Sequence, residues 1–249
     1  MNKLENQVFI CIDCETTGLD AKADRIIEVG AMRFTIDKIL DQWESLIDPG
    51  CVIPETSIEI HHISQEMVAG KPTIVQMLPQ IIDFVGNEII IGHGVGFDVE
   101  VLAIAAERAG IPQTLRSNRT LDTLRMARLY GESPINSLEM LRQHFNIQFE
   151  GPHRAMSDVI VNVEVFKHLA KKFRYTEQIF EALSRPILMK VMPLGKHKGR
   201  PMKELPVDYL RRMANMEFDQ DLLYSIRTEL SRRKKGNLFS QAGNPFGDL

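Results

Sequence analysis

The chain has 249 residues, of which 44% are hydrophobic and 25% are charged, a composition ordinary for a folded globular protein. No apolar run reaches the roughly 18 residues that a membrane span needs. The polar N-terminus is followed by an apolar run that contains Asp13, which is not typical of a secretory signal. These features exclude a membrane-embedded protein and predict a cytoplasmic one without a membrane partner.

Charge is distributed unevenly along the chain. Residues 1–185 hold 18 Lys or Arg and 26 Asp or Glu, a net −8, whereas residues 186–235 hold 12 and 6, a net +6. An acidic body with a basic appendage fits a protein that holds cations in one part and meets polyanions with the other. Before any motif is considered, a solvated basic helix explains the appendage equally well.

Hydrophobic patterning indicates an α/β domain in the first part of the chain. An apolar run at residues 8–12 suits a central buried strand, and further strands are predicted at 26–34, 39–47 and 89–91. Helical spacing of apolar residues predicts helices at 74–84, 97–109, 121–129, 138–145 and 155–173. Three successive strands, followed by strands alternating with helices, imply a mixed sheet.

Pro186 marks the predicted end of this domain. A basic stretch rich in turn formers follows at 192–201, and helices are predicted at 208–216 and 221–233. Residues 236–249 contain three Gly, two Asn and one Pro, which predicts a mobile tail. The expected organisation is a domain of residues 1–185, a small basic module of residues 186–235 and a flexible tail of residues 236–249.

The three cysteines, Cys11, Cys14 and Cys51, are too few and odd in number for a disulfide framework. Cys11 and Cys14 form a C-x-x-C, but zinc would need two more ligands and the sequence offers no second pair. In a strand, an offset of three sends the two side chains to opposite faces. A zinc or redox role is therefore disfavoured.

The first acidic motif, Asp13-Cys14-Glu15-Thr16-Thr17-Gly18, comes where the first buried strand ends. Asp13 and Glu15 are two residues apart, so their side chains point to the same side of an extended backbone. Like charges on one face repel each other, but Mg²⁺ takes hard oxygen ligands of this kind, and ligands gather at strand ends in open α/β sheets. A D-x-E alone is more often a solvated turn; the T-T-G behind it favours a metal site.

Two further motifs place acids at helix starts. Gly92-His93-Gly94-Val95-Gly96-Phe97-Asp98 puts Asp98 in a first helical turn, where the helix dipole favours an anion. His153-Arg154-Ala155-Met156-Ser157-Asp158 puts Asp158 inside a long helix with His153 just ahead of it, so one segment can supply a metal ligand and a mobile base. The structural alternatives are an acidic helix start, a turn histidine at His93, and surface positions for Arg154 and Ser157.

Taken in order, these segments resemble the DEDDh exonucleases, the family of the proofreading epsilon subunit of bacterial DNA polymerase III, over roughly residues 5–175. The resemblance implies a ribonuclease-H-like α/β fold, a mixed five-stranded sheet flanked by helices, and 3′→5′ exonuclease activity. By position, it implies that the metal ligands are Asp13, Glu15, Asp98 and Asp158 and that His153 is the general base. The implied cofactors are two Mg²⁺ or Mn²⁺ ions about 3.5–4 Å apart, which clamp the scissile phosphate.

The same resemblance implies substrate contacts at Thr16, Thr17, His62 and Phe97, although core packing explains Phe97 equally well. The pair Asp122-Thr123 is also similar to the family. Many members have Asn after the histidine of the second motif, whereas this chain has Gly94. Glycine removes a polar contact and leaves the acid in place, so this departure concerns substrate contacts more than catalysis.

The stretch 193–201, followed by Leu205-Pro206-Val207-Asp208-Tyr209-Leu210, resembles a small module found after some exonuclease domains, as in exonuclease X-like proteins. We expect its cations to meet nucleic-acid phosphates, so that binding weakens as salt rises. Docking of a protein partner is the alternative. The cations in question are Lys196, Lys198, Arg200 and Lys203.

The leading hypothesis is an enzyme that removes nucleotides from single-stranded or frayed DNA 3′ ends in proofreading or repair. An exoribonuclease that trims or degrades RNA is the enzymatic alternative, because such a site reads phosphates and a 3′ end more than the sugar. A non-catalytic nucleic-acid-binding protein is the alternative from another class, disfavoured because all four acids are present. A DNA polymerase and a sliding clamp stay open as partners; Leu238-Phe239 resembles clamp-binding peptides by two residues only.

Overall fold

The computed structural model describes residues 3–133, 135–149 and 154–241, with side chains described as far as residue 235. The chain divides between Ala182 and Leu183 into two compact units, residues 1–182 (unit 1) and residues 183–249 (unit 2). This division lies close to the boundary expected at Pro186.

Unit 1 is built on a five-stranded sheet with the order β3-β2-β1-β4-β5. Its strands are β1 (Phe9–Thr16), β2 (Ile26–Phe34), β3 (Ile39–Leu46), β4 (Ile89–Gly92) and β5 (Thr120–Asp122). β2 is antiparallel to β1 and β3, whereas β4 is parallel to β1 and β5 is parallel to β4. The predicted mixed five-stranded sheet is thereby confirmed.

The fifth strand corrects one predicted element. A helix is predicted from residue 121, but residues 120–122 pair with β4 as β5, and helix α5 (Thr123–Tyr130) begins only at Thr123. A strand of three residues is too short to show an alternating pattern. Three short helices were not predicted from the hydrophobic pattern: α1 (Glu55–His61), α2 (Gln65–Val68) and α8 (Thr176–Leu183).

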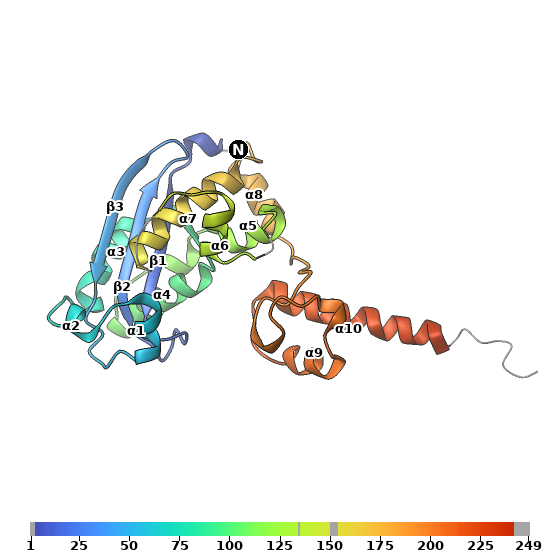
Figure 1. Cartoon of the computed structure of the whole chain (residues 1–249). Helices are drawn as coiled ribbons and strands as arrows, with labels where there is room; N and C mark the ends of the chain where they lie inside the picture. Colours follow the sequence, from blue (N-terminus) through green and yellow to red (C-terminus); the bar gives the residue numbers. More distant parts are fainter. Residues whose placement is uncertain (1–2, 134, 150–153, 242–249) are drawn as a thin grey trace, which may run out of the picture. The chain divides into compact units, whose positions relative to one another are not determined.

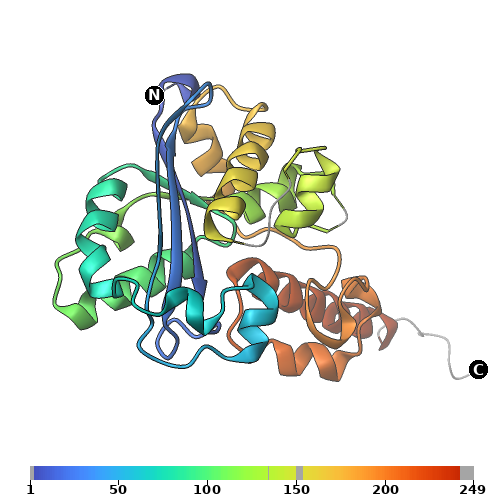
Figure 2. The same ribbon diagram turned by 60° about the vertical axis from the view of Figure 1, so that its left-hand side comes forward.

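Helices cover both faces of the sheet (Figures 1 and 2). α3 (Ile74–Val85) and α4 (Gly96–Ala109) lie on one face, and α7 (Ala155–Ala170), flanked by α5 and α6 (Leu138–His144), lies on the other. Because β1 is covered on both sides, its first residues form the continuous apolar run expected of a buried strand.

The side chains of β1 alternate between these two layers. Ile10 and Ile12 belong to the core beneath α3 and α4. Phe9 instead packs on α7, where its ring lies 5.1 Å from Phe166 and 5.7 Å from Phe34 of β2. Continuing this alternation along β1 brings residues 11, 13 and 15 to the α7 side.

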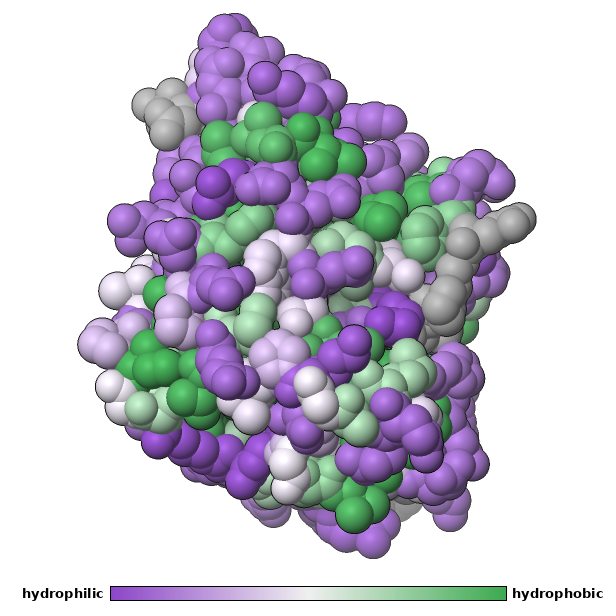
Figure 3. Space-filling model, turned by 90° about the vertical axis from the view of Figure 1, so that its left-hand side faces the viewer, coloured by the Kyte–Doolittle hydropathy of each residue, from purple (hydrophilic) through white to green (hydrophobic). Residues whose placement is uncertain are grey.

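The edge strand β3 is largely exposed. Its polar and charged side chains interrupt the hydrophobic ones, Ile39 and Leu40 among them, which disfavours pairing with another strand. The face of the molecule drawn in Figure 3 is mainly hydrophilic, and its hydrophobic residues form separate patches. No helix in the described part of the chain is both long enough and apolar enough to cross a membrane.

Unit 2 contains α9 (Val207–Met213) and α10 (Gln220–Gln241) around its own core. That core is formed by Met192, Met202, Leu205, Leu210, Met213, Leu222 and Ile226. The expected mainly helical module is confirmed. The predicted tail needs correction, because α10 continues to Gln241 and so includes residues 236–241. Once a helix is nucleated, extending it fixes the backbone of only one residue for each hydrogen bond gained. A long helix can therefore continue into a segment of weak helix propensity.

Candidate active site

Three of the predicted acids come together where β1 ends. Asp13 and Glu15 lie near the end of β1, and Asp158 lies in the first turn of α7. Each offers a carboxylate oxygen, and these oxygens all lie within 4.8 Å of one another. All three residues are half-buried. The expectation that Asp13 and Glu15 point to one side follows directly from the extended backbone of β1.

Asp98 approaches the same strand end from α4. It lies in the first turn of that helix and is buried. Its Oδ1 accepts a hydrogen bond from the backbone N–H of Cys14 at 2.9 Å. Because Cys14 stands between Asp13 and Glu15, this bond ties Asp98 to the strand that carries those two acids. Asp98 is not part of the set whose oxygens meet within 4.8 Å.

The acids raise one another's pKa. Burial is the main cause for Asp13, and the charges of Asp98, Asp158 and Glu15 add to it, so its pKa lies well above the usual range. Burial, followed by the charge of Asp158, raises the pKa of Glu15 to about 7. Burial also raises the pKa of Asp98 to about 7. A bound divalent cation would offset both the burial and the repulsion.

The loop of the second motif is held by α5. The His93 ring is satisfied: Nε2 donates to the backbone oxygen of Asn136 at 2.8 Å, and Nδ1 lies 3.1 Å from Thr123 Oγ1. The Gly94 N–H donates to Asp122 Oδ1 at 3.0 Å. Gly94 has φ +82°, a conformation that favours glycine. His93 is therefore a structural turn histidine, and the departure at Gly94 suits the backbone of this loop.

Thr16 and Thr17 are buried, and their hydroxyl groups form hydrogen bonds with the loop that follows β1. The Thr16 hydroxyl donates to the carbonyl oxygen of Gly18 at 2.6 Å, and the Thr17 hydroxyl donates to Asp24 Oδ1 at 2.9 Å. Phe97 is half-buried and packs on the core beneath α4. These contacts shape the backbone around the acids, and substrate contacts by the three side chains stay predictions.

His62, predicted to touch substrate, is exposed and ends α1 with φ +58°. Its neighbour His61 is the buried member of the pair: Nδ1 accepts from the Ile63 N–H at 3.0 Å, and Nε2 is buried and has no hydrogen-bond partner among the described residues. Burial lowers the pKa of His61, while the charge of Glu28 opposes this. The His-His pair was the sequence signal for His61, and patterning alone could not tell which member is buried.

Glu28 and Arg154 form a pair that was not predicted from the sequence. Glu28 is a buried acid of β2 bound to the Arg154 guanidinium, so Arg154 is not a free surface charge. A single Glu inside the apolar strand Ile26–Phe34 was the available signal. His153, the predicted base, lies outside the described residues.

Three of the four predicted phosphate-binding cations of unit 2, Lys196, Lys198 and Arg200, lie on one exposed loop, and the fourth, Lys203, follows it in a short 3-10 helix (Met202–Glu204). Val191 and Pro201 form a β-bridge that closes this loop, and it contains two glycines with positive φ, Gly195 and Gly199. Arg200 donates to Nδ1 of His197 at 3.2 Å, and the His197 ring packs edge-on against Tyr209 at 4.5 Å. Lys196, Lys198 and Arg200 are all exposed.

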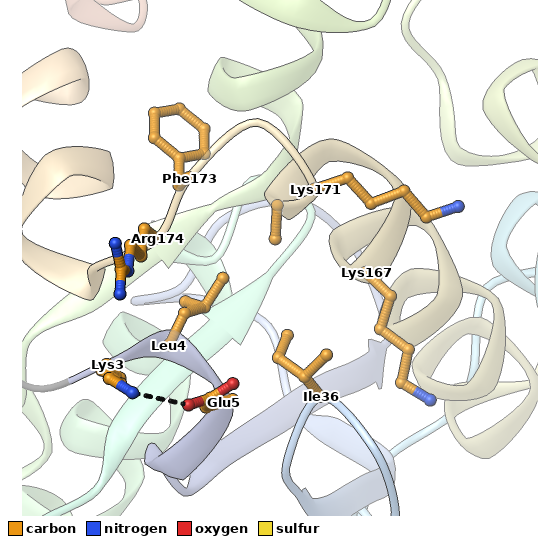
Figure 4. A pocket seen from close by; sticks show the side chains of 9 residues that line it. Lys3, Leu4, Glu5, Ile36, Lys167, Lys171, Phe173 and Arg174 are labelled. Atoms are coloured by element: carbon orange, nitrogen blue, oxygen red, sulfur yellow. Dashed lines mark hydrogen bonds and ion pairs between the residues drawn. The ribbon is translucent and has the colours of Figure 1, made fainter.

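A pocket of about 320 Å³ lies at the other end of α7 (Figure 4). Its cations surround an apolar floor that includes Leu4 and Ile36, and Lys3 is paired with Glu5 at 3.3 Å. None of the predicted site residues within the described part of the chain lines it. The cations are Lys3, Lys167, Lys171 and Arg174.

Comparison with known proteins places this geometry in a family. The family model described as "Exonuclease" matches residues 10–166, a range that contains Asp13, Glu15, Asp98 and Asp158. The chain belongs to the exonuclease family. The resemblance drawn from the three acidic motifs is thereby confirmed. The match ends before unit 2.

Two kinds of relative show how this exonuclease chain compares in length. It is 35% identical over 167 residues to the DNA polymerase III PolC-type of Clostridium perfringens, covering 67% of this chain but only 11% of that protein. The DNA polymerase III subunit epsilon of Aquifex aeolicus is 29% identical over 187 residues, covering 74% of this chain and 92% of that one. The chain thus spans about a tenth of the PolC-type relatives.

Solved structures share the fold. Exonuclease X in complex with 5′ overhanging duplex DNA matches with a TM-score of 0.56 at 23% identity, over 70% of this chain and 98% of that one. An E. coli exonuclease I complex with single-stranded DNA matches with a TM-score of 0.62 at 21% identity, over 72% of this chain and 43% of that one. The predicted fold class is confirmed.

Proposed function

We propose that this chain is a metal-dependent 3′→5′ exonuclease that removes nucleotides from DNA 3′ ends. The observation that carries the proposal is the meeting of carboxylate oxygens from Asp13, Glu15 and Asp158 within 4.8 Å. The similarity to an epsilon subunit of DNA polymerase III supports it, as does the similarity to exonucleases whose structures contain DNA.

The donor set fits hard divalent cations. It consists of carboxylates, which suit Mg²⁺ and Mn²⁺ better than softer metals. The pKa values of Asp13, Glu15 and Asp98 are all raised in the protein alone, so a cation would relieve an unfavourable arrangement. We propose that Asp13, Glu15, Asp98 and Asp158 together hold two such ions. When bound, the ions would supply Lewis acidity at phosphoryl oxygens and acidify a water molecule.

The residues of the chain have distinct tasks in this proposal. Asp13 and Glu15 are fixed by β1, and the Cys14 N–H holds the carboxylate of Asp98 against the same strand. Thr16 and Thr17 hold the loop after β1, over which the terminal nucleotide is proposed to lie, near Phe97 and His62. His153 is proposed as the base that takes a proton from the attacking water, because a free imidazole with a pKa of about 6.5 is largely neutral at pH 7.

Unit 2 is proposed to hold the nucleic acid. Its loop presents Lys196, Lys198 and Arg200 to solvent, and residues 186–235 carry a net charge of +6 from 12 cations and 6 anions. Exposed cations can reach phosphates at little cost in desolvation, which favours sequence-independent binding. The expected consequence is slower dissociation of the nucleic acid from the protein.

Digestion of end-labelled oligonucleotides tests the proposal. A 5′-labelled DNA strand should give a ladder of progressively shorter labelled products, whereas a 3′-labelled strand should release labelled mononucleotide at once. Both reactions should require Mg²⁺ or Mn²⁺ and stop in chelator. Label release that starts from the 5′ end, or digestion in chelator, would contradict the proposal.

The same assay with RNA decides the substrate class. Faster digestion of RNA than of DNA of equal sequence would assign the chain to RNA trimming or turnover. Binding of either polymer without digestion at any metal concentration would favour a non-catalytic binding protein.

A further inference from the structure

Glu28 is a buried acid beside the candidate active site that does not belong to its ligand set. Its side chain is 4% exposed, and its backbone is the cross-strand partner of Glu15. Burying a carboxylate is costly unless cations and N–H groups surround it. The partners of Glu28 therefore have to offset that cost.

Those partners belong to the start of α7. The Arg154 Nε–H lies 2.9 Å from each Glu28 carboxylate oxygen, and an Arg154 Nη2–H donates to Oε1 as well. The Ala155 N–H donates to Oε2 at 2.9 Å. Forked, charge-assisted hydrogen bonds are more directional than neutral ones, and an anion at a helix N-terminus complements the helix dipole. Glu28 thus fixes both the position and the direction of the α7 start.

Gly30 holds the same turn of α7 by close packing. It follows Glu28 by two residues and therefore lies on the same face of β2. A Cβ at Gly30 would stand 2.7 Å from the backbone C of Ala155 and from the N of Met156. A residue without a side chain allows this approach. β2 therefore contacts the start of α7 at two alternate positions, one through hydrogen bonds and one through shape.

The position of Asp158 depends directly on that of Arg154, through the backbone of α7. The Asp158 N–H donates to the Arg154 carbonyl oxygen at 3.0 Å, one turn along α7. A shift of the α7 start would therefore move Asp158 relative to Asp13 and Glu15, which are fixed in β1. We infer that Glu28, Arg154 and Gly30 are positioning residues: they set the spacing between α7 and β1 and thereby the affinity of the acidic site for divalent cations. This inference rests on the proposed function.

A purely electrostatic role for Arg154 predicts the opposite effect. Arg154 carries a positive charge close to Glu15, so its removal would strengthen the attraction for a cation if charge alone mattered. Loss of positioning would weaken it. The sign of the change in cation affinity in Arg154→Ala therefore separates the two.

Binding of Mn²⁺ to the full-length protein without nucleic acid tests this inference, with free Mn²⁺ measured by electron paramagnetic resonance. Arg154→Ala, Arg154→Lys and Gly30→Ala should each raise the Kd for Mn²⁺ by about tenfold or more, the size typical of groups that orient metal ligands. Arg154→Lys keeps the charge and loses the fork, and Gly30→Ala changes no charge. The matched control is Arg142→Lys, which breaks a similar forked pair with Glu139 inside α6 and should leave the Kd unchanged.

Exonuclease activity of the variants should recover as Mn²⁺ is raised toward saturation, which a general loss of structure would not allow. Circular dichroism and melting curves identify folded variants; if Arg154→Ala does not fold, Arg154→Lys and Gly30→Ala carry the test. Unchanged or tighter Mn²⁺ binding in the folded variants would overturn the positioning role while the wild type still binds Mn²⁺ and digests DNA. A wild type that neither binds Mn²⁺ nor digests nucleic acid would overturn the proposed function, and this inference with it.

Discussion

Charge is arranged in opposite ways in the two units of the chain. In unit 1, carboxylates crowd together at the end of β1, half-buried or buried, and raise one another's pKa. In unit 2, Lys196, Lys198 and Arg200 are exposed on one loop, where water and salt screen their charges. The crowded carboxylates lower the free energy of unfolding, whereas the exposed cations change it little. Groups held at a cost point to chemistry at a fixed geometry, whereas exposed cations point to affinity that salt can adjust.

The largest effect is expected from Asp13→Asn, which would lower the rate of DNA digestion by at least about a thousandfold, since an amide lacks the charge that holds a divalent ion. In chelator at neutral pH the same variant should melt at a higher temperature than the wild type, because burial of an amide requires neither a buried charge nor the uptake of a proton on folding. The measurements are single-turnover digestion and calorimetry. Asp37→Asn, an exposed acid between β2 and β3, is the matched control and should change neither. Normal activity in Asp13→Asn would contradict the view that the crowded carboxylates of unit 1 carry out the chemistry.

A second effect is expected on stability as a function of pH. In the protein without metal, the pKa of Glu15 is raised from 4.5, and that of Asp98 from 3.8, to about 7. A raised pKa means that the folded protein keeps protons that the unfolded chain has released. The contribution of these two groups to stability should therefore be fully present below about pH 4 and be lost as the pH rises through about 7. As upper limits, these shifts correspond to roughly 3 kcal/mol for Glu15 and roughly 4 kcal/mol for Asp98.

Melting curves in chelator between pH 5.5 and 8 measure this loss, which we expect to amount to roughly 5 °C or more. Glu15→Gln removes one of the two groups and should make the decline shallower. Addition of Mn²⁺ should restore more stability at pH 8 than at pH 5.5, because deprotonated acids bind the ion. A wild type and a Glu15→Gln variant with the same pH dependence would show that Glu15 is not held at a cost.

A smaller effect is expected in unit 2. Replacement of its loop cations by Gln, at Lys196, Lys198 and Arg200, should weaken binding to long single-stranded DNA by about tenfold at low salt and reduce the slope of log Kd against log salt. Digestion of a very short oligonucleotide should be nearly unchanged. The matched control replaces three exposed cations of α10 by Gln, at Arg227, Lys234 and Lys235. An equal loss in both triple variants would attribute binding to net charge and not to the loop.

The parts of this molecule that could be predicted from sequence are those governed by short-range rules. The shared direction of Asp13 and Glu15 follows from a two-residue period, and the place of Asp98 in a first turn follows from a strand, a glycine-rich loop and a helix. The boundaries of β2 were predicted from its apolar run alone. Strand β5 was not, because its three residues obtain their structure from pairing with β4.

Contacts between segments distant in sequence could not be read from patterns. Glu28 and Arg154 are 126 residues apart, and only the packing of α7 on β2 makes them a pair. The pattern gave no means to choose between His61 and His62, since the choice depends on which side of α1 faces the core. The role of the Cys14 backbone N–H as partner of Asp98 has no sequence signal at all.

The smallest expected effects come from a matched pair of glycines, one in each unit. Gly94 has φ +82° and Gly199 has φ +81°, and among the described residues beyond each glycine's two chain neighbours no atom lies within 4 Å of the position of an added Cβ. Alanine should therefore introduce the same backbone strain at both sites, about 1 kcal/mol, without a steric clash. If geometry is fixed in unit 1 and tolerant in unit 2, the functional results should differ.

Gly94→Ala should lower kcat severalfold, because Gly94 leads into the turn that carries Asp98. Gly199→Ala should leave kcat unchanged and shift only the Kd for long DNA, by about twofold. Equal melting temperatures with this split in kinetics would sharpen the contrast; a lower kcat in both variants would mean that the loop of unit 2 also takes part in the reaction.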